Sequence, residues 1–155
     1  MGEAEGSALS RMRCSEIMTR DVRTATREMT LREVAHMMRD GDMGSVPVVE
    51  DVRLIGIVTD RDIVVRCVAE GHDANTPISE AMTTEICSVK PNDFVFEAVR
   101  LMGEKQVRRV PVIDNDDRLV GIISMADVAL ETEDELEIAE TLEEISSGSA
   151  FWSKK

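Results

Sequence analysis

The segment "GIVTDRD" (56–62) decides the fold, because it returns 65 residues later as "GIISMAD" (121–127). Two other segments recur in the same order. "SEIMT" (15–19) returns as "SEAMT" (79–83), and "SVPVVE" (45–50) returns as "RVPVID" (109–114). Three matches in one order indicate a duplicated unit. The period is too long, and the copies are too few, for a solenoid.

Each copy has the same predicted order of strand, helix, strand, strand, helix. We expect the opening strands at 22–25 and 86–89, and the paired strands on either side of acidic turns at Asp51 and at 114–117. The last helices are expected to begin near Asp60 and near Ala126. Thr30 and Glu33 have the spacing of a capping box before the first helix. Apolar residues at i, i+3, i+4 and i+7 predict its buried face and that of its counterpart: Leu31, Val34, Ala35 and Met38; Val95, Ala98, Val99 and Met102.

The chain has 155 residues, 43% of them hydrophobic, which allows one domain or two small ones that share a core. One repeat alone is too small to bury its sheet. We therefore predict an α+β fold of two strand-helix-strand-strand-helix repeats, packed face to face about a pseudo-twofold axis. The expected divisions are a leading segment (1–13), the first repeat (14–72), the second repeat (73–132), and an acidic helix with its tail (133–155).

The net charge of −13 argues against a nucleic-acid partner and against anionic membranes. No apolar run has the length of a membrane span, and the first ten residues lack the basic and apolar parts of a signal peptide. We therefore expect a cytoplasmic protein. The three cysteines, Cys14, Cys67 and Cys87, are far apart and form no Cys-x-x-Cys, so neither a disulfide framework nor a zinc knuckle is predicted.

Two polar pairs stand where a strand is expected to give way to a helix: Thr59 with Asp62, and Ser124 with Asp127. One interpretation is a helix cap, in which the hydroxyl accepts a hydrogen bond from a backbone N–H and the aspartate complements the helix dipole. Capping motifs are common, so a single copy would favour this structural interpretation.

Three features favour a ligand site as well. Gly56 and Gly121 lie inside strands, where glycine often marks the close approach of a ligand or of another backbone. A helix N-terminus after a strand can hold phosphate, while a carboxylate one turn on can accept hydrogen bonds from vicinal hydroxyls. Both copies keep the glycine, the hydroxyl residue and the aspartate. Phosphate and a diol together describe a ribonucleotide.

These motifs, with "VPVVE" (46–50) and "VPVID" (110–114), give the chain its resemblance to a tandem pair of CBS domains, also called a Bateman module. The resemblance covers roughly residues 14 to 130, and "TDRDIV" (59–64) and "VRRVPV" (107–112) are similar to runs in small stand-alone bacterial proteins of the hypoxic-response type. Any one motif is weak, whereas their order and duplication are specific.

The resemblance implies that adenosine nucleotides bind in the cleft between the two motifs. It implies that Asp62 and Asp127 hold ribose, and that Thr59 and Ser124 contact phosphate or ribose. It also implies that adenine lies against the opening strand of the opposite motif, so that Asp127 shares a ligand with the residues before the first helix and Asp62 with those before its counterpart. By position these adenine residues are Thr19, Val22 and Thr24, and Thr83, Ile86 and Ser88.

The two copies differ where the phosphates are expected. Arg108 and Arg109 precede the second "VPV", a position that often supplies phosphate-binding basic residues in the family, whereas the first copy has Gly44 and Ser45. Guanidinium groups suit phosphate because they donate two hydrogen bonds at once. The alternative is an exposed strand edge or ion pairs with the many carboxylates. We expect the Asp127 site to bind charged nucleotides better than the Asp62 site, unless Arg61 or Arg27 contributes there.

No catalytic constellation is recognised, and we predict a protein that is not an enzyme. His36 and His72 have no partner at ligand spacing, so no metal site is predicted. The acidic helix is most simply a solvated face, although its weak apolar side and Phe151 and Trp152 could anchor a partner.

Our first hypothesis is a regulatory sensor that binds AMP, ADP, ATP or a related adenosine compound, with Mg²⁺ possible, and signals to a separate effector protein by a population shift. The resemblance implies a homodimer. The second hypothesis is a ligand-independent docking module in which the Thr–Asp and Ser–Asp pairs are only caps. The third is nucleotide hydrolysis, for which no base is visible.

Overall fold

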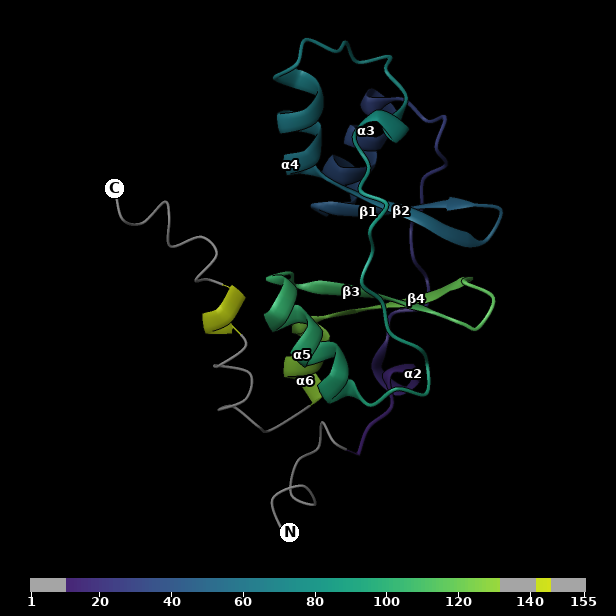
Figure 1. The fold of residues 1–155 in the computed structure, drawn as a ribbon, viewed down its shortest axis with the longest axis vertical. Coiled ribbons are helices and arrows are strands. Elements are labelled where there is room, and N and C mark those ends of the chain that lie inside the picture. Colours follow the sequence, from purple (N-terminus) through teal and green to yellow (C-terminus); the bar gives the residue numbers. More distant parts are fainter. Residues whose placement is uncertain (1–10, 132–141, 146–155) are drawn as a thin grey trace. The chain divides into compact units, whose positions relative to one another are not determined.

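The computed structural model describes residues 11–131 and 142–145, which fall into two compact units (Figure 1). The first-repeat unit consists of residues 23–86 and 116–119. The second-repeat unit contains the chain up to residue 22, residues 87–115, and the chain from residue 120 onward. The α+β class predicted from the sequence is confirmed, because each unit combines helices with a small antiparallel or mixed pairing of strands.

The first-repeat unit is built on an antiparallel hairpin of β1 (Ser45–Glu50) and β2 (Arg53–Thr59). Asp51, in the left-handed region at φ 61°, makes the predicted acidic turn. Helix α3 (Leu31–Gly41) begins at the predicted capping box, in which the Glu33 N–H donates to Thr30 Oγ1 at 3.1 Å. The helix after β2 begins as predicted at Asp60, as α4 (Asp60–Asp62), and continues as the π-helix η1 (Ile63–Val68). A short 3-10 helix, η2 (Ile78–Glu80), completes the unit.

The second-repeat unit follows the same plan. It contains α2 (Cys14–Ile17), α5 (Val95–Lys105), β3 (Arg109–Ile113), β4 (Leu119–Ser124) and α6 (Met125–Glu131). Helix α6 begins one residue before the expected Ala126. Helices α2, α5 and α6 lie on one side of the β3–β4 hairpin (Figure 1). Most of the predicted acidic helix lies outside the described residues, which include only a helical turn at 142–145.

The first segment of each repeat packs with the core of the other repeat. Thr19, from the first "SEIMT", exchanges backbone hydrogen bonds of 2.8 and 2.9 Å with Ile122 of β4. Thr83, from "SEAMT", makes the same pair with Ile57 of β2 at 2.8 and 2.9 Å. The two repeated segments, residues 15–19 and 79–83, are called arms below. They extend the two hairpins in equivalent ways, which explains why this motif is duplicated along with the rest.

The opening strands predicted at 22–25 and 86–89 are wrong as continuous strands. Only the last residue of each pairs: Ala25 with Val48 of β1, and Val89 with Val112 of β3, both in parallel. Ala25 and Val89 are buried and attach each segment to its sheet at a single point. Thr19 and Ala25 lie in different units, so the chain between them cannot stay paired with one sheet.

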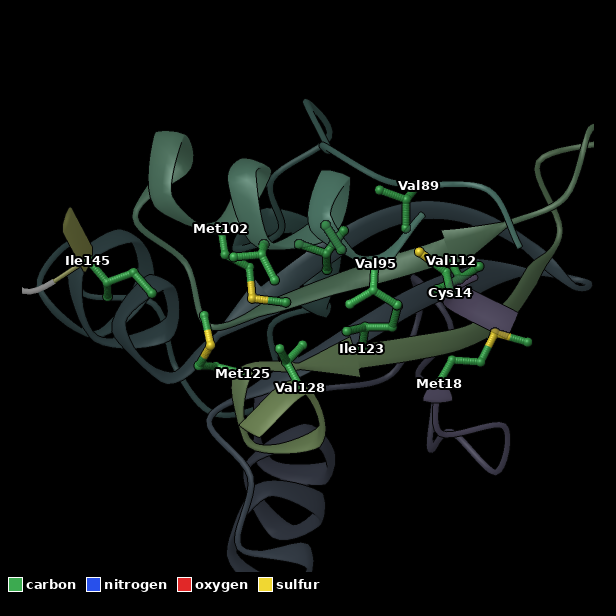
Figure 2. Packing of buried hydrophobic residues seen from close by; sticks show 13 residues of the cluster. Cys14, Met18, Val89, Val95, Met102, Val112, Ile123, Met125, Val128 and Ile145 are labelled. Atoms are coloured by element: carbon green, nitrogen blue, oxygen red, sulfur yellow. The ribbon is translucent and has the colours of Figure 1, made fainter. Parts of the chain in front are cut away.

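Buried residues form two clusters, one in each unit. In α5 the four predicted positions Val95, Ala98, Val99 and Met102 are all buried. In α3 the prediction holds for Leu31, Val34 and Met38 but fails at Ala35, which is exposed. Figure 2 shows the second-repeat cluster, in which Met18 from the arm, Met102 from α5 and Met125 from α6 meet valine and isoleucine side chains of the hairpin.

Candidate functional site

Thr59 and Asp62 form a complete reciprocal cap at the start of α4. The Asp62 N–H donates to Thr59 Oγ1 at 3.0 Å, and the Thr59 N–H donates to Asp62 Oδ2 at 3.0 Å. Asp62 Oδ1, the other carboxylate oxygen, lies 3.9 Å from Nε of Arg66, one helical turn further on. The structural interpretation of this pair is therefore realised, and both carboxylate oxygens have a partner group within the unit.

Ser124 and Asp127 form the same cap at the start of α6. The Asp127 N–H donates to Ser124 Oγ at 3.1 Å, and the Ser124 N–H donates to Asp127 Oδ2 at 3.0 Å. The residue four positions after Asp127 is Glu131, where the first repeat has Arg66. Across the described residues, Asp127 Oδ1 meets no hydrogen-bond donor or cation. The cap thus fixes a half-buried carboxylate and leaves one oxygen able to accept hydrogen bonds.

The two strand glycines have a structural explanation. A Cβ at Gly121 would lie 2.5 Å from Sδ of Met18 and 3.0 Å from the Thr19 carbonyl oxygen. At Gly56 the equivalent atoms of Met82 and Thr83 would lie at 2.8 and 3.1 Å. Of the two causes that the sequence allowed, a ligand or another backbone, the second applies: the arm crosses directly over the glycine.

The predicted adenine residues divide between the two units. Thr19 and Val22 belong to the same unit as Ser124 and Asp127, and Thr24 belongs to the other. Thr83 and Ile86 belong with Thr59 and Asp62, and Ser88 belongs to the other unit. The backbone pairs of Thr19 with Ile122 and of Thr83 with Ile57 place each arm on the strand that leads into the cap. Ligand contacts of these residues stay a prediction.

Arg108 is fixed by its backbone beside the start of α6. Its carbonyl accepts the Met125 N–H at 2.9 Å, and both Arg108 and Arg109 are exposed. In the first repeat the Gly44 carbonyl accepts the Asp60 N–H at 3.0 Å, and the Asp60 carboxylate lies 3.5 Å from where a Cβ of Gly44 would be. The second repeat therefore has a guanidinium where the first has no side chain, and a methionine where the first has a carboxylate.

The sequence reasoning missed two features of this comparison. The Asp62–Arg66 ion pair could have been found, because i and i+4 residues face each other on a helix. The carboxylate of Asp60 beside Gly44 could not, because it depends on how the strand and the helix meet. The Asp60 carboxylate makes the first-repeat cap less suited to an anionic ligand, and the Arg66 guanidinium competes for the Asp62 oxygen that a hydroxyl would use.

The two buried cysteines do not add a second site. Burial, and then the nearby carboxylates of Asp93 and Glu97, raise the pKa of the Cys14 thiol from 9.0 to about 12. Burial also raises the pKa of Cys67. Such thiols stay protonated and unreactive at neutral pH. Within residues 11–131 and 142–145, no three His, Cys, Asp or Glu side chains gather in a way that could hold a metal ion, and no helix could cross a membrane.

A sequence model of the family described as "CBS domain" matches residues 14–68 and 78–133. CBS domain-containing protein YhcV of Bacillus subtilis is 42% identical over 115 residues, which are 74% of this chain and 81% of YhcV. Hypoxic response protein 1 of Mycobacterium tuberculosis is 42% identical over 116 residues, which are 74% of this chain and 80% of that protein.

Solved structures have the same fold. A crystal structure of Hypoxic Response Protein I with two coordinated zinc ions has a TM-score of 0.71 at 40% identity, and the match covers 77% of this chain and 98% of that one. A crystal structure of CBSX2 in complex with AMP has a TM-score of 0.69 at 21% identity, with 77% and 94% of the two chains covered. At 21% identity the second comparison establishes the fold alone.

Proposed function

This chain belongs to the CBS domain family as a tandem pair, and from that premise we propose that it is a regulatory module that binds an adenosine nucleotide at the Asp127 cap. CBS domain proteins are in general regulatory rather than catalytic. The observation that carries the proposal is the half-buried Asp127 carboxylate, whose Oδ2 is held by the Ser124 N–H at 3.0 Å. Oδ1 is then held in a fixed direction to accept a ribose hydroxyl.

A preoriented carboxylate suits this role because a hydrogen bond to a charged acceptor is stronger than one between neutral groups. The cap contributes the preorganisation: the carboxylate loses little further freedom when a ligand arrives. The AMP held by CBSX2, a protein of the same fold, supports an adenosine compound as the ligand class. In this chain the base would lie against Thr19, in the arm that crosses β4, and against Val22.

The charges around the two caps support an order of affinity. Near the Asp127 cap stand Arg108 and Arg109, which would attract phosphate. The Asp62 cap has Asp60 close by, and Arg66 lies 3.9 Å from the oxygen that a ribose would need. Phosphate would therefore be repelled by one carboxylate and ribose would compete with a cation. We propose that Thr59, Asp62, Thr83 and Ile86 form the weaker site, with Thr24 and Ser88 as outlying members of the two sets.

The proposed mechanism is a shift in population toward the arrangement that completes the ligand's contacts. The response would reach a separate effector protein, and we propose a homodimer as the working assembly. Mg²⁺ would enter only with the phosphates of ADP or ATP. Asp127 holds a hydroxyl in this proposal and moves no proton, so we propose no enzymatic step.

Isothermal titration calorimetry of the full chain with AMP, ADP, ATP, adenosine and GMP tests the proposal. Asp127→Asn keeps an oxygen for the Ser124 N–H but removes the charge, and it should weaken binding about 10- to 100-fold, as the loss of one or more charged hydrogen bonds predicts. Asp62→Asn, the same change in the other cap, is the matched control and should alter the tighter site by less than about threefold. Arg108→Ala should weaken ATP more than adenosine.

A folded protein that binds none of the adenosine compounds would rule out the sensor and would favour the ligand-independent docking module. If Asp62→Asn and Asp127→Asn had equal effects, the proposed order of the two sites would be wrong. Conversion of ATP to ADP that Asp127→Asn abolishes would instead support nucleotide hydrolysis.

A further inference from the structure

The helical turn at 142–145 packs against the core of the second-repeat unit. Ile145 is 8% exposed and belongs to the cluster that contains Met102 of α5 and Met125 and Val128 of α6. Figure 2 shows Ile145 at the end of this cluster where Met102 and Met125 lie. Leu142, one turn earlier, is 40% exposed. Of the two apolar side chains of the turn, Ile145 is therefore buried and Leu142 is turned toward solvent.

Helix α5 contacts this turn through Gly103 and Gln106, and these two residues are called the seat below. Gly103 is buried inside the helix, and a Cβ there would collide with the Glu144 carboxylate. The side-chain amide of Gln106 donates to the Glu144 carbonyl at 3.3 Å. Glycine disfavours a helix interior, so its presence at this position needs a reason. The Glu144 carboxylate occupies the space beside Gly103, and a side chain at this position would have to displace it.

The first repeat has no equivalent seat. The positions that correspond to Gly103 and Gln106 are Arg39 and Asp42. Arg39 is exposed and its guanidinium pairs with Asp40 at 2.9 Å. A side chain of that size would occupy the space that Glu144 takes on α5. The two helices have equal lengths and equivalent places in their repeats, so the seat distinguishes the second repeat from the first.

The docked turn and the proposed ligand site are connected through one hydrophobic cluster. Met125 directly follows Ser124 of the cap, is buried in the same cluster as Ile145, and donates its N–H to the Arg108 carbonyl at 2.9 Å. Release of Ile145 would open one end of the cluster to which Met125 also belongs, and Met125 lies in the first turn of α6. Loss of order in that turn would disturb the Asp127 cap.

We propose that residues 142–145 form a latch, which docks reversibly on Gly103 and Gln106 of α5 and is energetically linked to the Ser124–Asp127 cap. The link to a ligand rests on the proposed function, since it takes that cap to be the nucleotide site. By reciprocity, a nucleotide that orders the cap favours the docked latch, and a docked latch favours the nucleotide. The chain's own C-terminal segment would then report the ligand to a partner.

Hydrogen exchange by mass spectrometry of the full chain tests the latch without any ligand. Ile145→Asp, and independently Gly103→Arg, should speed exchange at 142–145 about tenfold or more and should also speed exchange in the first turn of α6. Leu142→Asp, the same kind of change at the exposed position, should do neither. The α3 amides of the other unit serve as an internal reference, and circular dichroism checks that each variant is folded.

Three outcomes would overturn the proposal: a wild-type segment 142–145 that exchanges as fast as an unprotected peptide, an effect of Leu142→Asp equal to that of Ile145→Asp, or acceleration confined to 142–145. Addition of AMP forms a separate arm. AMP that binds by calorimetry should slow exchange at 142–145, and no change there would refute the link. If neither AMP nor any other adenosine compound of the panel binds, the proposed function fails, whereas the ligand-free comparison still decides the latch.

Discussion

Replacing Gly121 by alanine should destabilise the second-repeat unit, because the new methyl group has no room. Its Cβ would lie 2.5 Å from Sδ and 2.8 Å from Cγ of Met18, and 3.0 Å from the Thr19 carbonyl oxygen. The methionine could shift only within a packed cluster, since it is itself 8% exposed. The carbonyl oxygen belongs to the backbone pair of Thr19 with Ile122, so a shift of the arm would strain those two hydrogen bonds.

The expected cost follows from these two contributions. Overpacking of a core by one methyl group costs about 1–3 kcal/mol, and each weakened hydrogen bond adds up to about 1 kcal/mol. We therefore expect Gly121→Ala to lower the free energy of unfolding by about 2–4 kcal/mol, which in a chain of this size lowers Tm by roughly 5–15 °C. Urea denaturation followed by circular dichroism measures the first quantity, and a thermal melt the second.

Gly56→Ala is the matched control, because the same methyl group would meet Met82 at 2.8 Å and the Thr83 carbonyl at 3.1 Å, which are longer distances. It should cost about half as much. A double-mutant cycle isolates the cause: Met18→Ala makes room, so Gly121→Ala should cost at least about 1 kcal/mol less in that background. A cost of Gly121→Ala below about 0.5 kcal/mol, or strict additivity with Met18→Ala, would refute the close approach.

Two further predictions concern pH and capping. The pKa of Cys14 is raised to about 12 by burial and then by Asp93, so above pH 9.0 the unfolded state loses a proton that the folded state keeps. The free energy of unfolding should fall by roughly 1 kcal/mol per pH unit from pH 9 toward pH 12, measured by urea titration; Cys14→Ala should flatten this slope, and an unchanged slope would contradict the assignment. Thr30→Ala should lower the free energy of unfolding by about 1 kcal/mol, because Thr30 Oγ1 accepts the Glu33 N–H at 3.1 Å. Thr30→Ser should retain most of that energy, and an alanine variant as stable as the serine variant would show that the cap contributes nothing.

The sequence predicted the hairpins, the main helices and both caps because these depend on local patterns that occur twice. A pattern in β1 and β2 that returns in β3 and β4 is strong evidence for one supersecondary unit. The capping pairs Thr59 with Asp62 and Ser124 with Asp127 were readable for the same reason, since a cap is made within four residues.

Features that depend on long-range packing were not readable from periodicity. The arms that contain Thr19 and Thr83 have nearly the same sequence, so the pattern alone does not say which hairpin each one joins. The family resemblance implied only that each arm shares a ligand with the aspartate of the other repeat. The single-residue pairing of Ala25 and Val89 was mistaken for strands, because a short segment bounded by apolar residues does not reveal whether a neighbouring strand is present.

The cap and the ligand site, which the sequence presented as alternatives, are compatible because they use different oxygens of Asp127. Oδ2 accepts the Ser124 N–H at 3.0 Å, and Oδ1 remains for a hydroxyl. Asp127→Ala would remove both and would leave a loss of binding open to two explanations. Asp127→Asn retains one acceptor for the cap, so a variant that melts within a few degrees of the wild type but binds AMP more weakly would assign the charge to the ligand. If Asp127→Asn instead lowered the melting temperature by many degrees, and its weaker AMP binding followed from that loss of stability, the carboxylate would be only a cap.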